Sequence, residues 1–405
     1  MLYSVEIENF FSVGERQILD LRARKSVDDP LARLSPIYKG ADERAPTVVA
    51  LFGPNAAGKS NILRSIAFGS WFVAHSFGHR SDLSLPYEKF GSDERIKKTT
   101  RLAFSFAGPV NPLSISEDSD QCPYTYEVVF SPRGNSRVDE VLLEKMCYQP
   151  RGKGKFRTLF ERNESNAVKA EKGFLTSGTE KALKEVLRPR ASVIATLAQL
   201  NHTIATAFVE AALSVVSNIF IDRVEDDVRT MTKWYHSNPN ALEELQGIAR
   251  RIDLGIDEIG IDSSSSEPMM LFRHSGLDQI ISLNRESHGT QQFIKIFPYI
   301  LMALDRGGVA IIDELDTTIH PLILPEILRW FGDPKRNPHG AQLWTTCHSA
   351  SLLTELTKEE VFFCEKDPEG NTTVFNLADV DRVRRNENFY GKYMGGEYGA
   401  VPVLG

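Results

Sequence analysis

The sequence predicts an α/β fold in which a parallel β-sheet forms the core, with an attached antiparallel β subdomain and a helical insertion. Residues 47–52 (TVVALF) and 308–316 (GVAIIDELD) contain apolar runs typical of strands buried on both faces of a parallel sheet. Between them, residues 101–160 contain strand-like segments separated by turn residues. Residues 176–252 carry apolar residues three and four positions apart, which favours helices.

The composition is that of an ordinary globular protein. The chain has 405 residues, of which 41% are hydrophobic and 25% charged, so global disorder is excluded and two or three domains are expected. The formal net charge of −7 restricts any nucleic-acid contact to a local basic patch. No apolar run approaches the roughly 20 residues of a membrane span. Four cysteines without a CxxC pair favour a reducing, cytoplasmic location.

The N-terminal third begins with strands and reaches the first parallel strand at residue 47. Residues 2–8 and 17–21 are predicted strands, and the polar segment 22–45, with two prolines, is predicted to be a surface loop. The strand 47–52 leads through a glycine-containing loop into a helix that extends to residue 75.

An antiparallel sheet is predicted next, because short alternating segments are separated by turn signals. The basic loop 151–157 (RGKGKFR) is either a solvated hairpin tip or a contact for a phosphate backbone. The predicted strands are residues 101–107, 124–130, 137–148 and 156–160.

The middle of the chain is predicted to be helical, and the last third returns to alternating strands and helices. The expected divisions are residues 1–165, a helical insertion at 166–270, and residues 271–405. The predicted helices of the insertion are 195–220 and 238–252, and a connection follows at 252–265. In the last third, helices are expected at 286–308 and 321–333, and strands at 308–316, 361–367 and 372–379. A strand followed by a helix is expected at 341–353.

The loop at residues 53–60 matches the phosphate-binding pattern G-x-x-x-x-G-K-[ST] in full. It lies between a buried strand and a helix, which is the structural context this Walker A motif requires. Backbone N–H groups there can face phosphate oxygens, Lys59 would pair with the β- and γ-phosphates of ATP, and Ser60 would ligate Mg²⁺. The predicted nucleotide-binding residues are Gly53, Pro54, Asn55, Ala56, Ala57, Gly58, Lys59, Ser60 and Asn61.

Two acidic residues at the end of the second apolar strand complete a Walker B segment. Asp313 would hold the magnesium shell, and Glu314 would polarise the attacking water. His348 follows another apolar strand, from which it can reach a γ-phosphate. A lone histidine is more often a core or surface residue, but this position near the Walker B segment favours the catalytic interpretation.

The order of these motifs resembles a known group of ATPases. After the Walker A loop come ESHG at 286–289, IIDELDTTIHP at 311–321 and TTCHS at 345–349, as in the ABC-type ATPase heads of the SMC, RecF and OLD group. Bacterial AAA-family ATP-binding proteins of phage-defence and restriction loci are more similar still. The start IENFFSVGE, with Phe11 where arginine is common, and the end NFYGKYMGGEYGAVP also resemble that family.

The resemblance implies a P-loop NTPase of ABC-ATPase head type that works as a dimer. Ser287 and Gly289 would form a signature loop that contacts the γ-phosphate of a nucleotide held by a second protomer. Asp316 would be the D-loop aspartate and His348 the switch histidine. The loop differs from the transporter form LSGGQ, which argues against a transporter subunit.

The implied function is an ATP- and Mg²⁺-dependent dimer switch that regulates a separate effector, such as a nuclease, in anti-phage defence. The homodimer or a higher homo-oligomer would form through the ATPase heads, without a membrane. The alternative is a RecF- or SMC-like DNA-repair ATPase that acts directly on DNA, so nucleic-acid binding stays open. A third hypothesis is a nucleotide-gated scaffold with negligible turnover.

Overall fold

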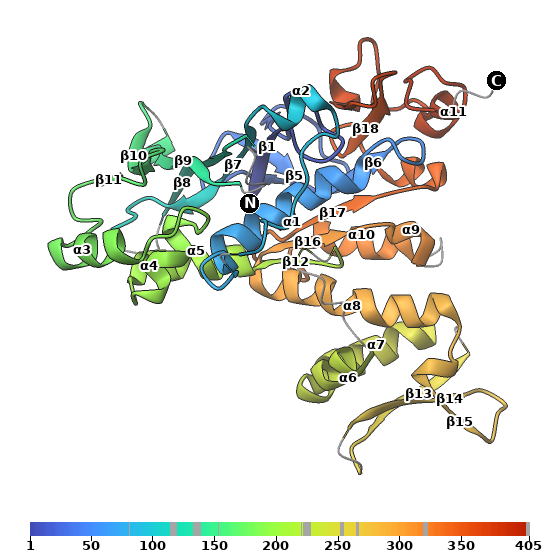
Figure 1. Ribbon diagram of the computed structural model, residues 1–405. Coiled ribbons are helices and arrows are strands. Elements are labelled where there is room, and N and C mark those ends of the chain that lie inside the picture. The colour runs from blue at the N-terminus through green and yellow to red at the C-terminus, as the bar shows by residue number, and fades with distance from the viewer. Residues whose placement is uncertain are drawn as a thin grey trace.

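A computed structural model describes residues 1–80, 82–113, 120–132, 139–152, 154–219, 221, 228–251, 255–264, 267–318 and 323–401. Its centre is a six-stranded sheet (Figure 1). The first five strands of this sheet run parallel to one another and the last is antiparallel, which confirms the predicted parallel core. The strands, in spatial order, are β12 (Val215–Ser217), β16 (Val309–Ile312), β17 (Gln342–Thr346), β6 (Val48–Phe52), β18 (Val361–Lys366) and β19 (Thr372–Asn376).

Helices cover both faces of this sheet. On one face, Val49, Leu51 and Trp344 pack into a core shared with α1 (Lys59–His75). On the other face, Val48 and Ala50 belong to a second core, shared with α8 (His288–Arg306) and α10 (Leu324–Gly332). Burial on both faces explains why the central strands are continuously apolar.

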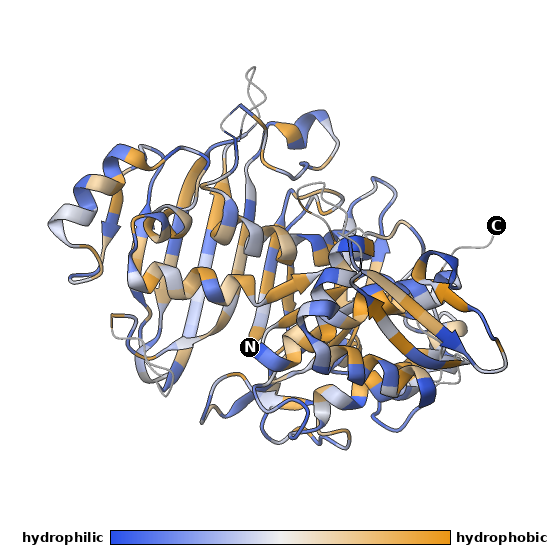
Figure 2. Ribbon diagram, turned by 90° about the horizontal axis from the view of Figure 1, so that it is seen from below, coloured by the Kyte–Doolittle hydropathy of each residue, from blue (hydrophilic) through white to orange (hydrophobic). Residues whose placement is uncertain are grey.

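A seven-stranded antiparallel sheet adjoins this core, as predicted. Its strands alternate in hydropathy because one face packs against α1, α4 (Val193–Gln199) and α5 (Thr203–Leu213), while residues that point to the other face are less buried. Figure 2 shows hydrophobic and hydrophilic residues alternating along the strands. The strands, in spatial order, are β11 (Val168–Ala170), β10 (Arg157–Arg162), β9 (Val141–Tyr148), β8 (Gln121–Phe130), β7 (Thr100–Pro109), β1 (Leu2–Glu8) and β2 (Gln17–Asp20).

A third group of elements lies beside α8. The helices α6 (Val228–Ser237) and α7 (Pro239–Arg251) pack near a small sheet of β13 (Ile256–Asp262), β14 (Met269–His274) and β15 (Ile280–Ser282) (Figure 1). The hydroxyl of Tyr235 donates to the carbonyl oxygen of Ile294 over 2.9 Å and so ties α6 to α8.

The remaining elements are short. Strands β3 (Ala23–Arg24), β5 (Glu43–Pro46) and β4 (Leu34–Pro36) form a three-stranded sheet. The remaining elements of the described residues are the helices α2 (Asp93–Ile96), α3 (Ser177–Val186), α9 (Leu315–Thr318) and α11 (Phe389–Met394) and the 3₁₀ segments Pro150–Gly152, Leu283–Arg285, Ala350–Glu355 and Leu377–Asp379. None of the described helices has the length and apolarity needed to cross a membrane.

Four sequence predictions need correction. The segment 22–45 is not a plain loop, because it contains β3 and β4 and leads into β5. The helix predicted at 195–220 is divided: Asn201 has a positive φ of 56°, and β-branched Val215 and Val216 pair with β16 as strand β12. The connection at 252–265 contains β13, and the segment after residue 346 forms a 3₁₀ turn rather than an α-helix. The three-part division of the chain stays a prediction.

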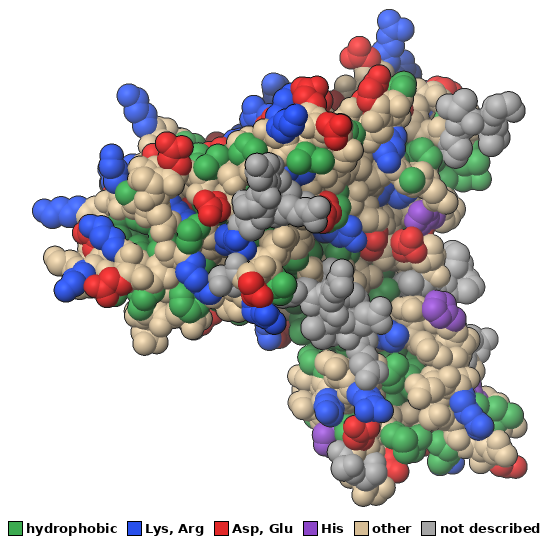
Figure 3. Space-filling view, in the orientation of Figure 1, with side chains coloured by type: hydrophobic (Ala, Val, Ile, Leu, Met, Phe, Trp, Pro, Cys, Tyr) green, Lys and Arg blue, Asp and Glu red, His purple; other side chains and the backbone are tan. Residues whose placement is uncertain are grey.

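The basic loop 151–157 joins β9 to β10. Lys153 and the side chain of Arg151 lie outside the described residues. Lys155 of this loop is exposed, as are Lys169 on β11 and Lys181 on α3. These elements lie at the left of Figure 1, and Figure 3, in the same orientation, shows Lys and Arg side chains projecting there. The two interpretations of this loop, a solvated tip and a phosphate-backbone contact, both stay hypotheses.

Candidate active site

The predicted nucleotide loop follows β6 at the carboxyl edge of the parallel sheet, where α/β proteins bind their ligands. Gly53 has a φ of 142°, and a Cβ there would lie 2.2 Å from the carbonyl oxygen of Cys364. Gly58 has a φ of 99°, and a Cβ there would lie 2.0 Å from Oγ1 of Thr372. Both glycines of the motif are therefore required by backbone conformation and by space.

Lys59 points back over the loop rather than out to solvent. Its Nζ donates to the carbonyl oxygens of Gly53 (2.8 Å) and Pro54 (3.1 Å), and the residue is 5% exposed. Burial lowers the pKa of its ammonium group. No carboxylate is within ion-pair distance of Nζ among the described residues, so a phosphate bound in the loop would supply the missing counter-charge.

Asn61 belongs to a brace behind the loop. Its Nδ2 donates to Oγ of Ser12 over 2.8 Å, and Ser12 Oγ lies 2.8 Å from Oγ1 of Thr372. Thr372 Oγ1 donates to the carbonyl oxygen of Ala57, also over 2.8 Å. Residues from β19 and from the turn after β1 therefore hold the loop in place. The predicted contact of Asn61 with nucleotide stays a prediction.

Ser60 and Asp313 meet although 253 positions separate them. Ser60 Oγ donates to Asp313 Oδ1 over 3.0 Å, and Thr346 Oγ1 donates to the same carboxylate oxygen over 2.6 Å. A hydroxyl and one carboxylate fit Mg²⁺, which takes oxygen ligands and binds through one or two carboxylates together with substrate phosphates. In the described part of the chain, no group of three or more His, Cys, Asp or Glu side chains could hold a metal without such phosphates.

Glu314 and His348 face each other beside this pair. Glu314 Oε1 lies 3.4 Å from His348 Nε2, and the Glu314 side chain is 55% exposed. Glu314 has a positive φ of 55°, and its backbone N–H donates to Thr346 Oγ1 over 2.7 Å. A non-glycine residue in this region is strained and needs surrounding contacts to hold it.

Asp316 holds the segment that carries His348. Its Oδ2 accepts the backbone N–H of His348 over 2.7 Å and also that of Ser349. The two predicted residues are therefore in direct contact within one protomer. His320 and Pro321 of the same motif lie outside the described residues.

Ser287 and Gly289 lie at the amino-terminal end of α8. Ser287 is the N-cap, and its Oγ accepts the backbone N–H of Thr290 over 3.2 Å. A Cβ added at Gly289 would meet nothing within 4 Å, so the first turn of α8 is open there. Within the described residues, the hydrogen bonds of Ser287 do not reach the loop 53–60. Both this end of α8 and that loop lie toward the right edge of Figure 1.

Two site residues were not identified from the sequence. Asn218, just after β12, bonds to both backbone polar groups of Asp313, and Thr346 bonds to Asp313 and Glu314. Thr346 could have been found from its position at the end of a strand next to the Walker B strand. Asn218 carried no such signal, because β12 was predicted to be part of a helix.

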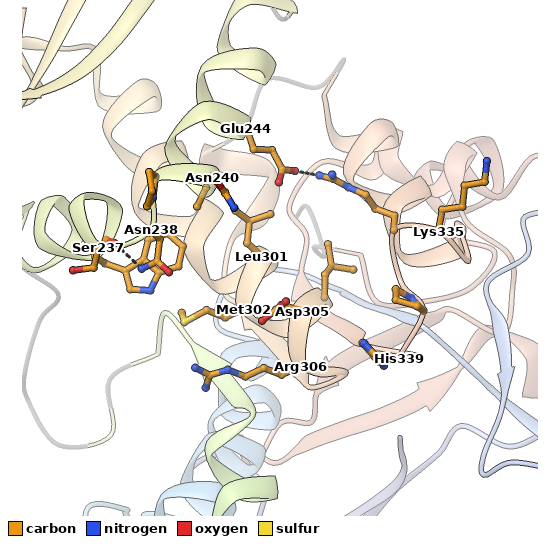
Figure 4. Close-up of a pocket in the computed structure, with 16 residues that line it drawn as sticks. Ser237, Asn238, Asn240, Glu244, Leu301, Met302, Asp305, Arg306, Lys335 and His339 are labelled. Carbon is orange, nitrogen blue, oxygen red and sulfur yellow. Dashed lines mark hydrogen bonds and ion pairs between the residues drawn. The ribbon is translucent and has the colours of Figure 1, made fainter. Parts of the chain in front are cut away.

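A separate pocket of about 570 Å³ lies between α6, α7, the end of α8 and the loop 333–340 (Figure 4). Glu244 pairs with Arg336 across it, and the Arg336 guanidinium lies 4.7 Å from the ring centroid of Trp330. None of its lining residues belongs to the predicted site.

Solved structures that are similar to this chain include heads of SMC proteins. The SMC head bound to the C-terminal winged-helix domain of ScpA has 12% identity and a TM-score of 0.49, with coverage of 92% of this chain and 96% of that chain. The Smc head domain from Pyrococcus furiosus has 13% identity and a TM-score of 0.46, with coverage of 93% of this chain and 97% of that chain. The SMC head domain from Thermotoga maritima has 12% identity and a TM-score of 0.39, with coverage of 93% of this chain and 98% of that chain. No curated protein matches the sequence.

The family described as "AAA domain, putative AbiEii toxin, Type IV TA system" matches residues 48–354. This range contains the Walker A loop, the signature-loop residues, the Walker B segment and His348. Because the match covers more than half of the chain, the protein belongs to this AAA-domain family, which confirms the resemblance drawn from its motifs.

Proposed function

We propose that the protein binds and hydrolyses Mg-ATP and acts as a nucleotide-driven dimer switch, which regulates a separate effector in anti-phage defence. The observation that carries the proposal is the meeting of three strand ends. Residues that follow β6, β16 and β17 form the pairs Ser60–Asp313 and Glu314–His348. Thr346, the last residue of β17, links the two pairs by its hydrogen bonds to Asp313 and Glu314.

The side chains have chemistry suited to phosphoryl transfer to water. Lys59, freed from its loop carbonyls, would bind the β- and γ-phosphates. Ser60 and Asp313 would hold Mg²⁺, which neutralises phosphate charge when bound. Glu314 is exposed enough to accept a proton from the attacking water. His348 would orient that water molecule and contact the γ-phosphate.

The position of the predicted signature loop supports the proposal of a dimer. The helix dipole at the start of α8 favours an anion, and the space around Gly289 leaves room for one. A second copy of the chain would place its own nucleotide there. Binding of the γ-phosphate by both copies would then favour the joined state over the separated one.

The defence role rests on the family. Its description names a putative toxin of a type IV toxin–antitoxin system. An ATPase that changes its assembly with nucleotide is a suitable control element for a partner effector, such as a nuclease.

The test is the solution mass of Glu314→Gln, measured by light scattering with and without Mg-ATP. This variant keeps the binding residues and lacks the carboxylate base, so ATP should raise the mass from the 45.4 kDa monomer to the dimer. The same variant with Ser287→Arg should stay at the monomer mass. A mass that stays at the monomer value with Mg-ATP would refute the dimer switch. A mass that is already at the dimer value without ATP would mean that ATP only rearranges heads that are in contact beforehand.

A DNA-repair ATPase that acts directly on DNA is the second candidate. One observation favours it: a surface pocket of about 680 Å³ is lined by Arg382, Arg384, Arg385 and Lys392. Arg385 and Lys392 already pair with Glu359 and Glu387, which reduces the free positive charge. Retention of duplex DNA that weakens steeply with salt would support this candidate.

A further inference from the structure

The backbone at Asp313 and Glu314 is held by side chains from the ends of both neighbouring strands. On one side is β17, whose Thr346 accepts the N–H of Glu314 over 2.7 Å and donates to the Asp313 carboxylate over 2.6 Å. On the other side is β12, which pairs with β16 only as far as Ser217 and Ile311. The residue after Ser217 therefore decides how the turn at Asp313 and Glu314 is supported on the side that faces β12.

Asn218 supplies that support with its side chain. Its backbone N–H still donates to the carbonyl oxygen of Ile311 over 3.2 Å. Its amide then continues the ladder: Nδ2 donates to the Asp313 carbonyl oxygen over 3.1 Å, and Oδ1 accepts the Asp313 N–H over 2.8 Å. An asparagine amide has both a donor and an acceptor, so it can satisfy both backbone groups of one residue.

We propose that Asn218 is a positioning residue for the ATPase reaction, acting through Asp313 and Glu314. Its two bonds fix the peptide units on either side of Asp313, so that the carboxylate faces Ser60 and the next residue adopts its positive φ of 55°. Without them, side-chain bonds would hold the turn on the β17 side only, through Thr346. This inference rests on the proposed function and deepens it.

The position of Asn218 in the chain gives the bond a second consequence. Asn218 belongs to the middle region, 166–270, which the sequence motifs do not cover. A residue of this region therefore contacts the Walker B backbone directly, 95 positions away in sequence. Any shift of β12 relative to β16 would move the turn that carries Asp313 and Glu314.

The test compares Asn218→Asp and Asn218→Ala with the wild type. The aspartate keeps the shape and the acceptor but has no donor for the Asp313 carbonyl oxygen; the alanine removes both groups. Asn240→Ala, an exposed asparagine on α7, is the matched control. The measured quantities are the Kd of a fluorescent ATP analogue without Mg²⁺, the Mg²⁺ concentration that half-saturates its tight binding, and kcat.

We expect Kd without Mg²⁺ to change by less than about threefold, because the loop 53–60 is untouched. The half-saturating Mg²⁺ concentration should rise and kcat should fall, each by about tenfold or more, as for other residues that orient metal ligands. Asn240→Ala should match the wild type. KM for ATP should change much less than kcat, since the lost contact positions the reacting groups.

Two results would overturn the proposal. One is an unchanged Mg²⁺ requirement and kcat in both Asn218 variants. The other is a loss of Mg²⁺-free binding in proportion to a loss of thermal stability, which would indicate a merely structural residue. Neither binding measurement needs turnover. A wild-type protein that binds Mg-ATP without hydrolysing it would refute the proposed reaction, while the Mg²⁺ requirement would still decide the role of Asn218.

Discussion

At the scale of single residues, Gly58 is the position where substitution has the clearest consequence. Its φ of 99° is unfavourable for any side chain, and a Cβ would lie 2.0 Å from Thr372 Oγ1 and 2.6 Å from Ser12 Oγ. Gly58→Ala should therefore lower the free energy of unfolding by about 1–3 kcal/mol and abolish ATP binding, because the brace behind the loop must shift. Urea unfolding and binding of a fluorescent ATP analogue measure the two effects.

The same substitution elsewhere provides the control. Gly247 is exposed within α7, and a Cβ there would meet nothing within 4 Å. Gly247→Ala should raise the free energy of unfolding by up to about 1 kcal/mol, because alanine favours the helix. Equal effects of the two substitutions would contradict the steric explanation.

The site residues differ in how far the sequence could reveal them. Gly53 to Ser60 form one local motif whose spacing follows from phosphate binding, and Asp313 and Glu314 end an apolar strand, so their chemistry could be predicted. Asn218 and Thr346 act through partners 95 and 32–33 positions away, which only the folded chain brings close. Thr346 at least stands at the end of an apolar strand, within the TTCHS segment, whereas no local pattern marks Asn218.

At the scale of elements, the long apolar strands were predictable and the short ones were not. The continuous runs 48–52 and 309–312 can only be buried, whereas β12 has three residues and follows a helix directly. Val215 and Val216 continue the helical spacing of α5, and pairing with β16 decides their conformation. Tertiary contacts override local preference in such short segments.

Glu144 is a buried polar link between the antiparallel sheet and the helices packed on it. This fully buried residue of β9 accepts the backbone N–H of Val193 over 2.9 Å and the hydroxyl of Ser192 over 2.8 Å, both at the start of α4. Arg162 on β10, also fully buried, lies 3.6 Å from its carboxylate. Glu144→Ala should destabilise the protein by about 3–5 kcal/mol, because it leaves the arginine buried without its partner.

Urea unfolding at constant pH measures this effect, and Glu127 on the neighbouring strand β8 is the matched control. Its carboxylate pairs with Arg101 over 2.6 Å, but both side chains are about one quarter exposed. Glu127→Ala should cost only about 0–1 kcal/mol, as is usual for pairs that water can reach. Equal losses from the two substitutions would show that burial of the Glu144 pair has no special effect.

At the scale of the whole molecule, the proposed mechanism divides each active site between two copies of the chain. One copy would provide Lys59, Ser60, Asp313 and Glu314, and the other would provide Ser287 and Gly289. In a symmetric dimer, each copy gives both halves, so two equivalent sites form. A variant with Lys59→Ala and a variant with Ser287→Arg would each be inactive alone, because each defect is present in both sites.

Mixing the two variants should restore ATP hydrolysis. In a mixed dimer, the Walker residues of the Ser287→Arg chain meet the intact signature loop of the Lys59→Ala chain, and the second site carries both defects. Since neither variant alone should form the ATP-joined dimer, the dimers in the mixture would be mixed, and each would hold one working site of two. Independent sites would therefore give at most about half of the wild-type rate. Lys59→Ala mixed with Glu314→Gln is the control and should stay inactive, because both defects affect the same half of the site. Activity in that control, or none in the first mixture while each variant still binds its partner, would contradict a site shared between two copies.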